Sequence, residues 1–271
     1  MIHLRGVGLL KPTLRRMLLL GVLVPLLGVF SSCSEGTGLS PTSEEPFLYV
    51  VLATEPFQGS LSDSVNRALL LTTGTPIMSP YRTAQSFEMR RVTDDALFAW
   101  RHEAMSRGAP PIGFREVSMS QGNYVLAEAG SAAGLGRRDL RPGESYSLLI
   151  VTDGRTVSGR VTIPESPRPA LLTTGGTRRV SWPRVNAAGG YRIETNTERF
   201  GPTVGITPDT SVELHFDGMR PLAPEIRVTA MDSNLYRYIT DPTLARAGIS
   251  GAFGVLGAVG PAARLLLPND P

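Results

Sequence analysis

The sequence predicts an all-β protein made of two β-sandwich-like domains, which follow a cleaved signal peptide and a flexible polar tether. Three observations indicate this fold class. Short runs rich in β-branched and aromatic residues recur along the chain, turn-forming residues separate them, and several runs alternate apolar and polar side chains. The 271 residues include 29 glycines and 22 prolines, which favours many turns and short strands over long helices.

The first domain is expected over residues 47–165. Residues 66–73 fit a strand or a helical turn, and the glycine and proline that follow favour the strand. Residues 96–104 fit a strand or a short helix with Asp94 as its N-cap. Further strands are expected at residues 46–53, 86–92, 114–120 and 123–129, the last two forming a hairpin.

The clearest local signal in this domain is a hairpin around Asp153-Gly154. The pair separates two β-rich runs, and glycine takes a positive φ there without a steric penalty. In the first run, Tyr146, Leu148 and Ile150 alternate with other residues, so this face is expected to point into a core.

A proline-rich stretch at residues 164–170 marks the expected boundary to a second domain over residues 168–240. Trp182 on an early strand, Tyr191 nine residues later, and a late strand reading V-x-A-x-D resemble a fibronectin type III or immunoglobulin-like domain. The resemblance implies a two-sheet sandwich with a buried tryptophan. Its strands are expected within residues 178–196, 211–216 and 224–232.

Residues 241–271 form a glycine-rich, apolar C-terminal segment. Glycine recurs at every third position from Gly248 to Gly260. Close helix pairing in membranes uses small residues four apart, which this period does not match. We expect a packed loop or strand that covers the sandwich, with a membrane-touching segment as the alternative.

Residues 1–32 have the three parts of a secretory signal peptide. Basic residues precede an apolar run at residues 17–30, and the small Ser31 and Ser32 follow it. A membrane-spanning helix needs about 20 apolar residues. This run is shorter and contains Pro25, so it is expected to be a cleaved signal rather than an anchor helix.

Cys33, the only cysteine, follows directly, so an intrachain disulfide is excluded. Residues 30–33, FSSC, resemble the lipobox of bacterial lipoproteins. The resemblance implies cleavage before Cys33 and a thioether bond from its sulfur to diacylglycerol. Ser34 resembles the outer-membrane sorting signal of such proteins. Residues 33–46 are expected to be a disordered tether.

The whole chain resembles a group of uncharacterised cell-envelope lipoproteins from Gram-negative bacteria. The pattern consists of the lipobox, an L-x-P-G-x-x-Y-x-L hairpin motif at residues 140–148, and A-x-D-x-N-x-Y-x-Y at residues 230–238. The relatives that this resemblance indicates are cell-surface lipoproteins encoded near outer-membrane nutrient transporters. It implies an outer-membrane location and an outer-membrane protein as partner, with no defined chemistry.

The charge distribution argues against nucleic-acid binding. The chain has a formal net charge of +3, but residues 1–32 hold four of the 27 basic residues and none of the 24 acidic ones. Without them the formal charge is −1, and the remaining arginine pairs are scattered. Nucleic-acid binding needs cations clustered on one face, so this class of partner is excluded.

The short patterns that resemble catalytic motifs each lack a required part. His102-Glu103 begins a zinc-protease motif, but the second histidine is missing. Residues 248–252, GISGA, lack the last glycine of a nucleophile elbow. The acids Asp94-Asp95 are adjacent, so in a strand they would point to opposite faces and not converge on one bond.

Two further candidates have simpler structural explanations. Asp232 and Asn234 match the first positions of a calcium-binding loop, but no third acid follows at the required spacing. We therefore expect their side chains to form hydrogen bonds with their own backbone in a turn. Tyr236 and Tyr238 would share a face if extended, so a half-buried pair on an edge strand is expected, with stacking on a sugar or partner as the alternative. His215 belongs to no metal-binding pattern.

We therefore expect a non-enzymatic envelope protein, held to the membrane through lipid on Cys33, with a binding or accessory role and no metal or cofactor. The alternative is an envelope hydrolase of glycan or peptide, whose acids converge only in the folded chain. A purely structural spacer is the third hypothesis. Which side of the outer membrane the protein faces, and its oligomeric state, stay open at this point.

Overall fold

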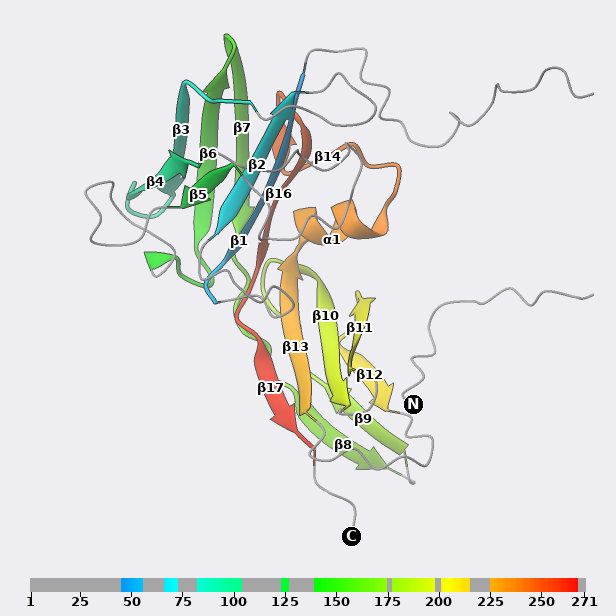
Figure 1. The fold of residues 1–271 in the computed structure, drawn as a ribbon. Coiled ribbons are helices and arrows are strands. Elements are labelled where there is room, and N and C mark those ends of the chain that lie inside the picture. Colours follow the sequence, from blue (N-terminus) through cyan, green and yellow to red (C-terminus); the bar gives the residue numbers. More distant parts are fainter. Residues whose placement is uncertain are drawn as a thin grey trace, which may run out of the picture.

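The computed structural model confirms the all-β fold class. It contains seventeen strands and one helix, α1 (Ser233–Thr240), in the ranges that it describes. Figure 1 shows the strands gathered in an upper and a lower region, with α1 beside the upper one. The described residues are 45–55, 66–72, 82–103, 123–126, 139–174, 177–197, 201–214 and 225–267.

The upper region is a sheet folded over into two layers. Its strands are β1 (Pro46–Ala53), β2 (Arg67–Thr72), β3 (Ser86–Arg91), β4 (Leu97–His102), β5 (Tyr124–Leu126), β6 (Ser145–Thr152), β7 (Arg155–Thr162), β14 (Arg246–Ala247), β15 (Ile249–Ser250) and β16 (Phe253–Val259). They are hydrogen-bonded in the order β16-β1-β2-β5-β4-β3-β6-β7-β15, and β14 pairs with β16. Figure 1 shows β3, β6 and β7 in one layer and β1, β2 and β16 in the other.

The inner core lies between these two layers. Every second side chain of a strand points into it, as Leu48, Val50 and Leu52 do in β1. Burial of such side chains stabilises the fold by about 1.5–3 kcal/mol each, so this core is the main source of stability in the upper region. Its other large members are Leu70, Phe87, Met89, Phe98, Trp100, Tyr124, Leu126, Tyr146, Leu148, Ile150, Val157, Val161 and Leu256.

The lower region has two smaller layers around a separate C-terminal core. Its strands are β8 (Ala170–Thr174), β9 (Thr177–Ser181), β10 (Ala188–Thr197), β11 (Gly201–Thr207), β12 (Ser211–Leu214), β13 (Glu225–Asp232) and β17 (Ala263–Leu266). The layer β11-β10-β13-β17 continues into the upper sheet through β16, and β12-β9-β8 form a second sheet. In this core Trp182 is buried, and its ring meets that of Tyr191 edge-on at 5.2 Å.

The glycine-rich C-terminal segment supplies strands to both regions and does not cover the sandwich from outside. β16 runs parallel to β1, from Phe253 opposite Phe47 to Val259 opposite Ala53. β17 then continues into the lower region and pairs with β13. The segment therefore lies inside the main sheet and connects its two halves.

Close backbone contacts explain why this segment is rich in glycine. Gly254 has a φ of +106°, and a Cβ there would overlap the carbonyl oxygen of Leu48 on β1. At Gly257 a Cβ would lie 2.7 Å from the Cβ of Leu235 in α1. Since neighbours approach β16 this closely, larger residues at these positions would push them away.

Helix α1 covers the face of β1 and β16 that points away from the inner core. Leu235 and Tyr238 of α1 pack against Phe47 and Val255, so β1 and β16 are buried on both faces. The expectation that Tyr236 and Tyr238 lie on an edge strand is wrong, because Asp232 ends β13 and caps a helix at this point.

Residues 97–102 form strand β4, so they do not form the short helix considered as an alternative for residues 96–104. Phe98 and Trp100 point into the inner core and their neighbours point outward, which is the period of a strand. Asp94 accepts a hydrogen bond from the N–H of Ala96 at 3.3 Å, but it does so in the turn between β3 and β4. Within the predicted range 66–73, residues Arg67–Thr72 likewise form a strand, β2.

The predicted hairpin at Asp153-Gly154 is confirmed. Both residues have positive φ, 47° and 71°, as the two central positions of a type I′ turn require. Tyr146, Leu148 and Ile150 of β6 are buried, also as predicted.

Two buried tyrosines hold turns in the same way, one in each region. The hydroxyl oxygen of Tyr146 accepts a hydrogen bond from the N–H of Arg141 at 2.8 Å, and that of Tyr191 accepts one from Val185 at 2.9 Å. Burial raises the pKa of Tyr146, which keeps its hydroxyl protonated. The tyrosine of the L-x-P-G-x-x-Y-x-L motif is therefore a structural residue.

Several predictions fall outside the described residues: the signal peptide, Cys33 and most of the tether, the strand at residues 114–120, and His215. Of residues 123–129, three form β5, which pairs with β2 and β4. Within the described ranges, no helix is long and apolar enough to cross a membrane.

Candidate functional site

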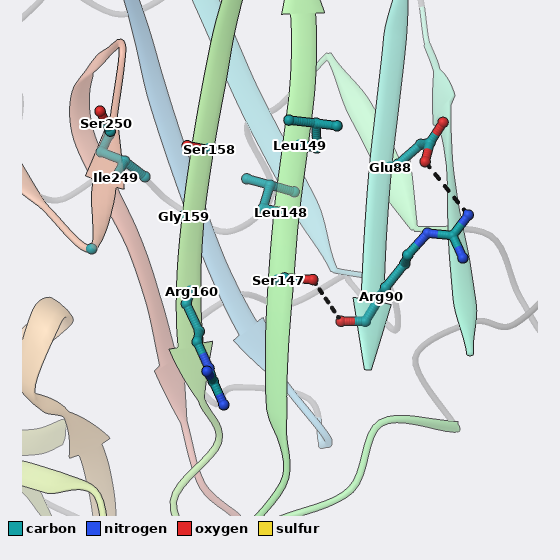
Figure 2. Close-up of a pocket in the computed structure, with 11 residues that line it drawn as sticks. Glu88, Arg90, Ser147, Leu148, Leu149, Ser158, Gly159, Arg160, Ile249 and Ser250 are labelled. Atoms are coloured by element: carbon teal, nitrogen blue, oxygen red, sulfur yellow. Dashed lines mark hydrogen bonds and ion pairs between the residues drawn. The ribbon is translucent and has the colours of Figure 1, made fainter. Parts of the chain in front are cut away.

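An open hollow of about 700 Å³ lies on the outer surface of the upper region, over β3, β6, β7 and β15. Figure 2 shows these strands, with Ile249 of β15 on one side and Arg90 of β3 on the other. The hollow faces away from the inner core, so most of its side chains alternate along the strands with buried ones. Those that determine its chemistry are Glu88, Arg90, Ser147, Leu149, Arg160 and Ile249.

Strand register determines which side chains meet in the hollow. Residues directly opposite one another in paired strands point to the same face of the sheet. Ser147 on β6 therefore stands between Arg90 and Arg160, and Leu149 stands beside Glu88. Two cross-strand rows face the hollow: Glu88, Leu149 and Ser158 in one, and Arg90, Ser147 and Arg160 in the other.

The short strand β15 forms one side of the hollow because Gly159 lets it approach β7. Ile249 pairs with Gly159, where a Cβ would overlap the carbonyl oxygen of Gly248. The side chain of Ile249 points toward β7 in Figure 2. A larger residue at position 159 would therefore displace this side of the hollow.

The two arginines of the hollow differ in their electrostatic surroundings. Arg90 pairs with Glu88 at 3.7 Å and with Asp95 at 2.8 Å, both exposed pairs that contribute under about 1 kcal/mol each. Arg160 forms no ion pair with any residue that the structure describes. In the neighbouring row Leu149 is 44% exposed, and Figure 2 shows the Arg160 side chain pointing away from it.

This lining is suited to binding. Ser147 donates its hydroxyl hydrogen to the carbonyl oxygen of Arg90 at 3.4 Å, and Ser250 is exposed on β15. Activation of a serine needs a base within hydrogen-bond reach. Among the described lining residues there is no histidine, and the one acid, Glu88, lies beside Arg90. The available interactions are apolar contact with Leu149, and a guanidinium for an anionic group.

The His102-Glu103 pair lies elsewhere, at the end of β4. His102 is exposed and its ring meets that of Tyr124 edge-on at 5.2 Å, while Glu103 accepts a hydrogen bond from Arg101 at 3.0 Å. The zinc-protease motif requires a helix to place its ligands one turn apart. A strand holds His102 here, so this pattern is a coincidence of sequence.

The adjacent acids Asp94 and Asp95 lie in the β3–β4 turn, and each pairs with a different arginine. Asp94 accepts from Nε of Arg91 at 3.0 Å, and Asp95 accepts from Nη1 of Arg90 at 2.8 Å. The hydrogen bonds to Ala96 and Arg91 and the charge of Arg91 hold the pKa of Asp94 below its usual value, although desolvation is the largest single influence and acts in the opposite direction. The pair stabilises a turn.

Asp232 is the most buried acid of the predicted candidates, and its oxygens are occupied. One carboxylate oxygen accepts the N–H groups of Leu235 at 3.0 Å and Ala258 at 2.9 Å, and the other accepts that of Asn234 at 3.2 Å. Burial raises the pKa of Asp232 to about 6, against the effect of these three hydrogen bonds. It therefore joins β13, α1 and β16. Nowhere in the described ranges do three or more potential metal-binding side chains cluster.

Asn234 makes a connection that sequence reasoning missed. Its side-chain N–H groups donate to the carbonyl oxygens of Arg160 at 3.3 Å and Leu256 at 3.2 Å. The amide therefore bridges β7, at a residue that lines the hollow, and β16. The A-x-D-x-N part of the motif thus fixes the position of α1 against the upper sheet, and only the three-dimensional arrangement makes this role visible.

No protein-family model matches the sequence, and a search of the curated proteins finds no match. The interpretation of the hollow therefore depends on its geometry alone.

Proposed function

We propose that this protein is a lipid-anchored component of the bacterial cell envelope that binds a partner without catalysing a reaction. The observation that carries the proposal is the leader at residues 1–32 followed directly by Cys33 in the lipobox-like FSSC. A thiol in this position takes diacylglycerol, and several acyl chains hold a protein firmly, at about 0.8 kcal/mol for each buried methylene. The outer membrane is the proposed location, on the basis of Ser34.

The hollow over β3, β6, β7 and β15 is the proposed contact for the partner. Leu149 offers apolar surface, and Arg160 offers a guanidinium without an ion pair among the described residues. A partner that presents an apolar side chain and, at a separate point, a carboxylate would match both. An outer-membrane protein with such a segment is the proposed class of partner.

Mass spectrometry of the N-terminal peptide from membrane-purified protein tests the anchor. We expect the peptide to begin at Cys33 and to carry diacylglycerol. Cys33→Ala should release the protein from the membrane fraction, whereas the control Ser40→Ala should leave it there. A native peptide without lipid, together with a Cys33→Ala protein that still fractionates with membranes, would rule the anchor out.

A photo-crosslinking side chain at position 149 tests the hollow in intact cells. We expect crosslinking from position 149 to an envelope protein, and loss of this adduct when Arg160→Glu is added. The control position is Thr173, an exposed residue of β8. Equal adducts from positions 149 and 173, or an adduct that Arg160→Glu leaves unchanged, would contradict the role of the hollow while leaving the anchor intact.

A further inference from the structure

We infer that the protein stands on the membrane with the upper region next to the lipid and the lower region pointing away from it. The inference rests on the proposed anchor at Cys33. The surface assigned to the lipid side is the end of the upper region formed by Glu45, the Asp153-Gly154 turn and Arg246. The argument follows from the direction of the strands and from where the chain leaves the described structure.

The chain enters the fold at the end of β1 that lies farther from the lower region. Pro46 begins β1, and the next residue, Phe47, pairs with Phe253 at the start of β16. At the other end of the pair Ala53 lies opposite Val259, which is itself paired with Met231 of β13. Eight strand residues, about 26 Å, therefore separate the entry point from the junction with the lower region.

The second layer of the upper region has the same polarity. Gly251, just before β16, lies against the carbonyl of Thr156 at the start of β7, and Gly260, just after β16, lies against that of Pro164. β7 therefore runs alongside β16 in the same direction. The Asp153-Gly154 turn stands at the entry end, and Pro164 stands at the junction. Figure 1 shows this turn and β8 at opposite ends of the molecule.

The length of chain before β1 limits how far this end can be from the lipid. Thirteen residues lead from Cys33 to Pro46, and even a fully extended chain of this length spans only about 45 Å. The far end of the lower region is about two strand lengths, on the order of 50 Å, from Pro46. The attached end must therefore remain the nearer one on average.

The chemistry of the entry end suits contact with a headgroup layer. Arg246 pairs with Glu45 there, and Arg82 pairs with Asp153 at 3.0 Å. These ion pairs are polar groups that a lipid headgroup region tolerates and the hydrocarbon region does not. The proposed orientation also leaves the hollow, which lies over the middle of β7, facing parallel to the membrane.

Energy transfer to a lipid-borne acceptor tests the orientation in vesicles that carry the full lipidated protein. Because lipid occupies Cys33, an introduced cysteine is the only free thiol and takes a single fluorescent donor. Three exposed residues are chosen for labelling: Thr156 at the entry end, Glu165 at the junction and Thr173 in the lower region. We expect transfer efficiency to fall in the order Thr156→Cys, Glu165→Cys, Thr173→Cys, with the outer two separated by tens of ångströms.

The outcomes separate this inference from the proposed function. A lipidated protein with equal efficiencies lies flat on the membrane, and a lipidated protein with the reverse order stands the other way, so either result overturns the orientation alone. An N-terminal peptide without lipid overturns the anchor and the orientation together. As a control, each labelled variant should unfold at the same temperature as the wild type, which verifies that the labels report on the native fold.

Discussion

The β6–β7 hairpin and the β1–β16 pair lie in the same two-layer region but are built in opposite ways. The hairpin joins neighbours in sequence through two turn residues, Asp153 and Gly154. The β1–β16 pair joins Phe47 to Phe253 across most of the chain, in a parallel arrangement that no tight turn can make. The comparison shows that this fold has locally determined parts held together by one non-local strand.

The non-local strand also links the two cores. β16 contributes Leu256 to the inner core and Val255 to the cluster under α1, and its last residue pairs with β13 of the lower region. β17 follows after three residues and joins the C-terminal core. Since both regions need the same segment, we expect them to lose their structure together.

The β6–β7 hairpin and the β1–β16 pair should differ most in the stability that each loses when one of its glycines is replaced. Gly254→Ala adds a Cβ that overlaps the carbonyl oxygen of Leu48 at a φ of +106°, so we expect a loss of more than about 4 kcal/mol. Gly154→Ala has a φ of +71° but no atom within 4 Å of the added Cβ, so about 1 kcal/mol is expected. Denaturant unfolding measures both, and equal losses would contradict the special role of β16.

The buried Asp232, which joins β13, α1 and β16, should make the free energy of unfolding depend on pH. Its pKa is about 6 in the folded protein, against an ordinary value of 3.8, so the folded state binds this proton more tightly than the unfolded chain does. Its contribution to the free energy of unfolding is then full below about pH 4 and is lost as the pH rises through 6. The difference between these two pKa values corresponds to roughly 3 kcal/mol of free energy of unfolding.

The matched variant for this prediction is Asp232→Asn, which keeps an oxygen acceptor for Leu235 and Ala258 but cannot ionise. We expect the wild-type free energy of unfolding, relative to that of the variant, to fall between pH 4 and pH 7. A difference that stays constant across this range would contradict the raised pKa of Asp232. Asp153→Asn, at a hairpin position that is 64% exposed, is the control for the loss of one carboxylate from the surface.

The smallest expected effect concerns the two tyrosine-held turns, which are local structures in different regions. Tyr146→Phe and Tyr191→Phe each remove one hydrogen bond to a backbone N–H, worth about 1 kcal/mol. If the two regions unfold as one body, each variant should show a single unfolding transition, with its midpoint lowered by a similar amount. Two transitions that shift separately, one in each variant, would show that the regions are independent.

The local structures of the fold could be predicted from the sequence, but the way they assemble could not. The Asp153-Gly154 turn was predictable because two adjacent residues determine it, and the alternation of Tyr146, Leu148 and Ile150 revealed the buried face. Helix α1 was not predicted, because eight residues after a strand carry little helical signal and their stability comes from packing on β1 and β16.

The candidate hollow was also beyond sequence reasoning. Glu88, Leu149 and Ser158 come from three strands, and only the register of those strands places them side by side. The Gly-rich repeat carried a real signal of close backbone approach, but the partners, Leu48 and Leu235 among them, are too distant in sequence to be deduced from spacing. The interpretation of Cys33, in contrast, depends only on the residues before it, and it stays a prediction.

The two tryptophans of the chain offer the most direct test of the claim that β16 makes the two regions one body. Trp100 lies in the inner core and Trp182 in the C-terminal core, so Trp182→Phe and Trp100→Phe leave one reporter for each. In each variant, denaturant unfolding followed by the remaining tryptophan should coincide with the loss of β-sheet circular dichroism. If either tryptophan instead reports a midpoint distinct from that of the sheet signal, the regions unfold independently and the claim fails.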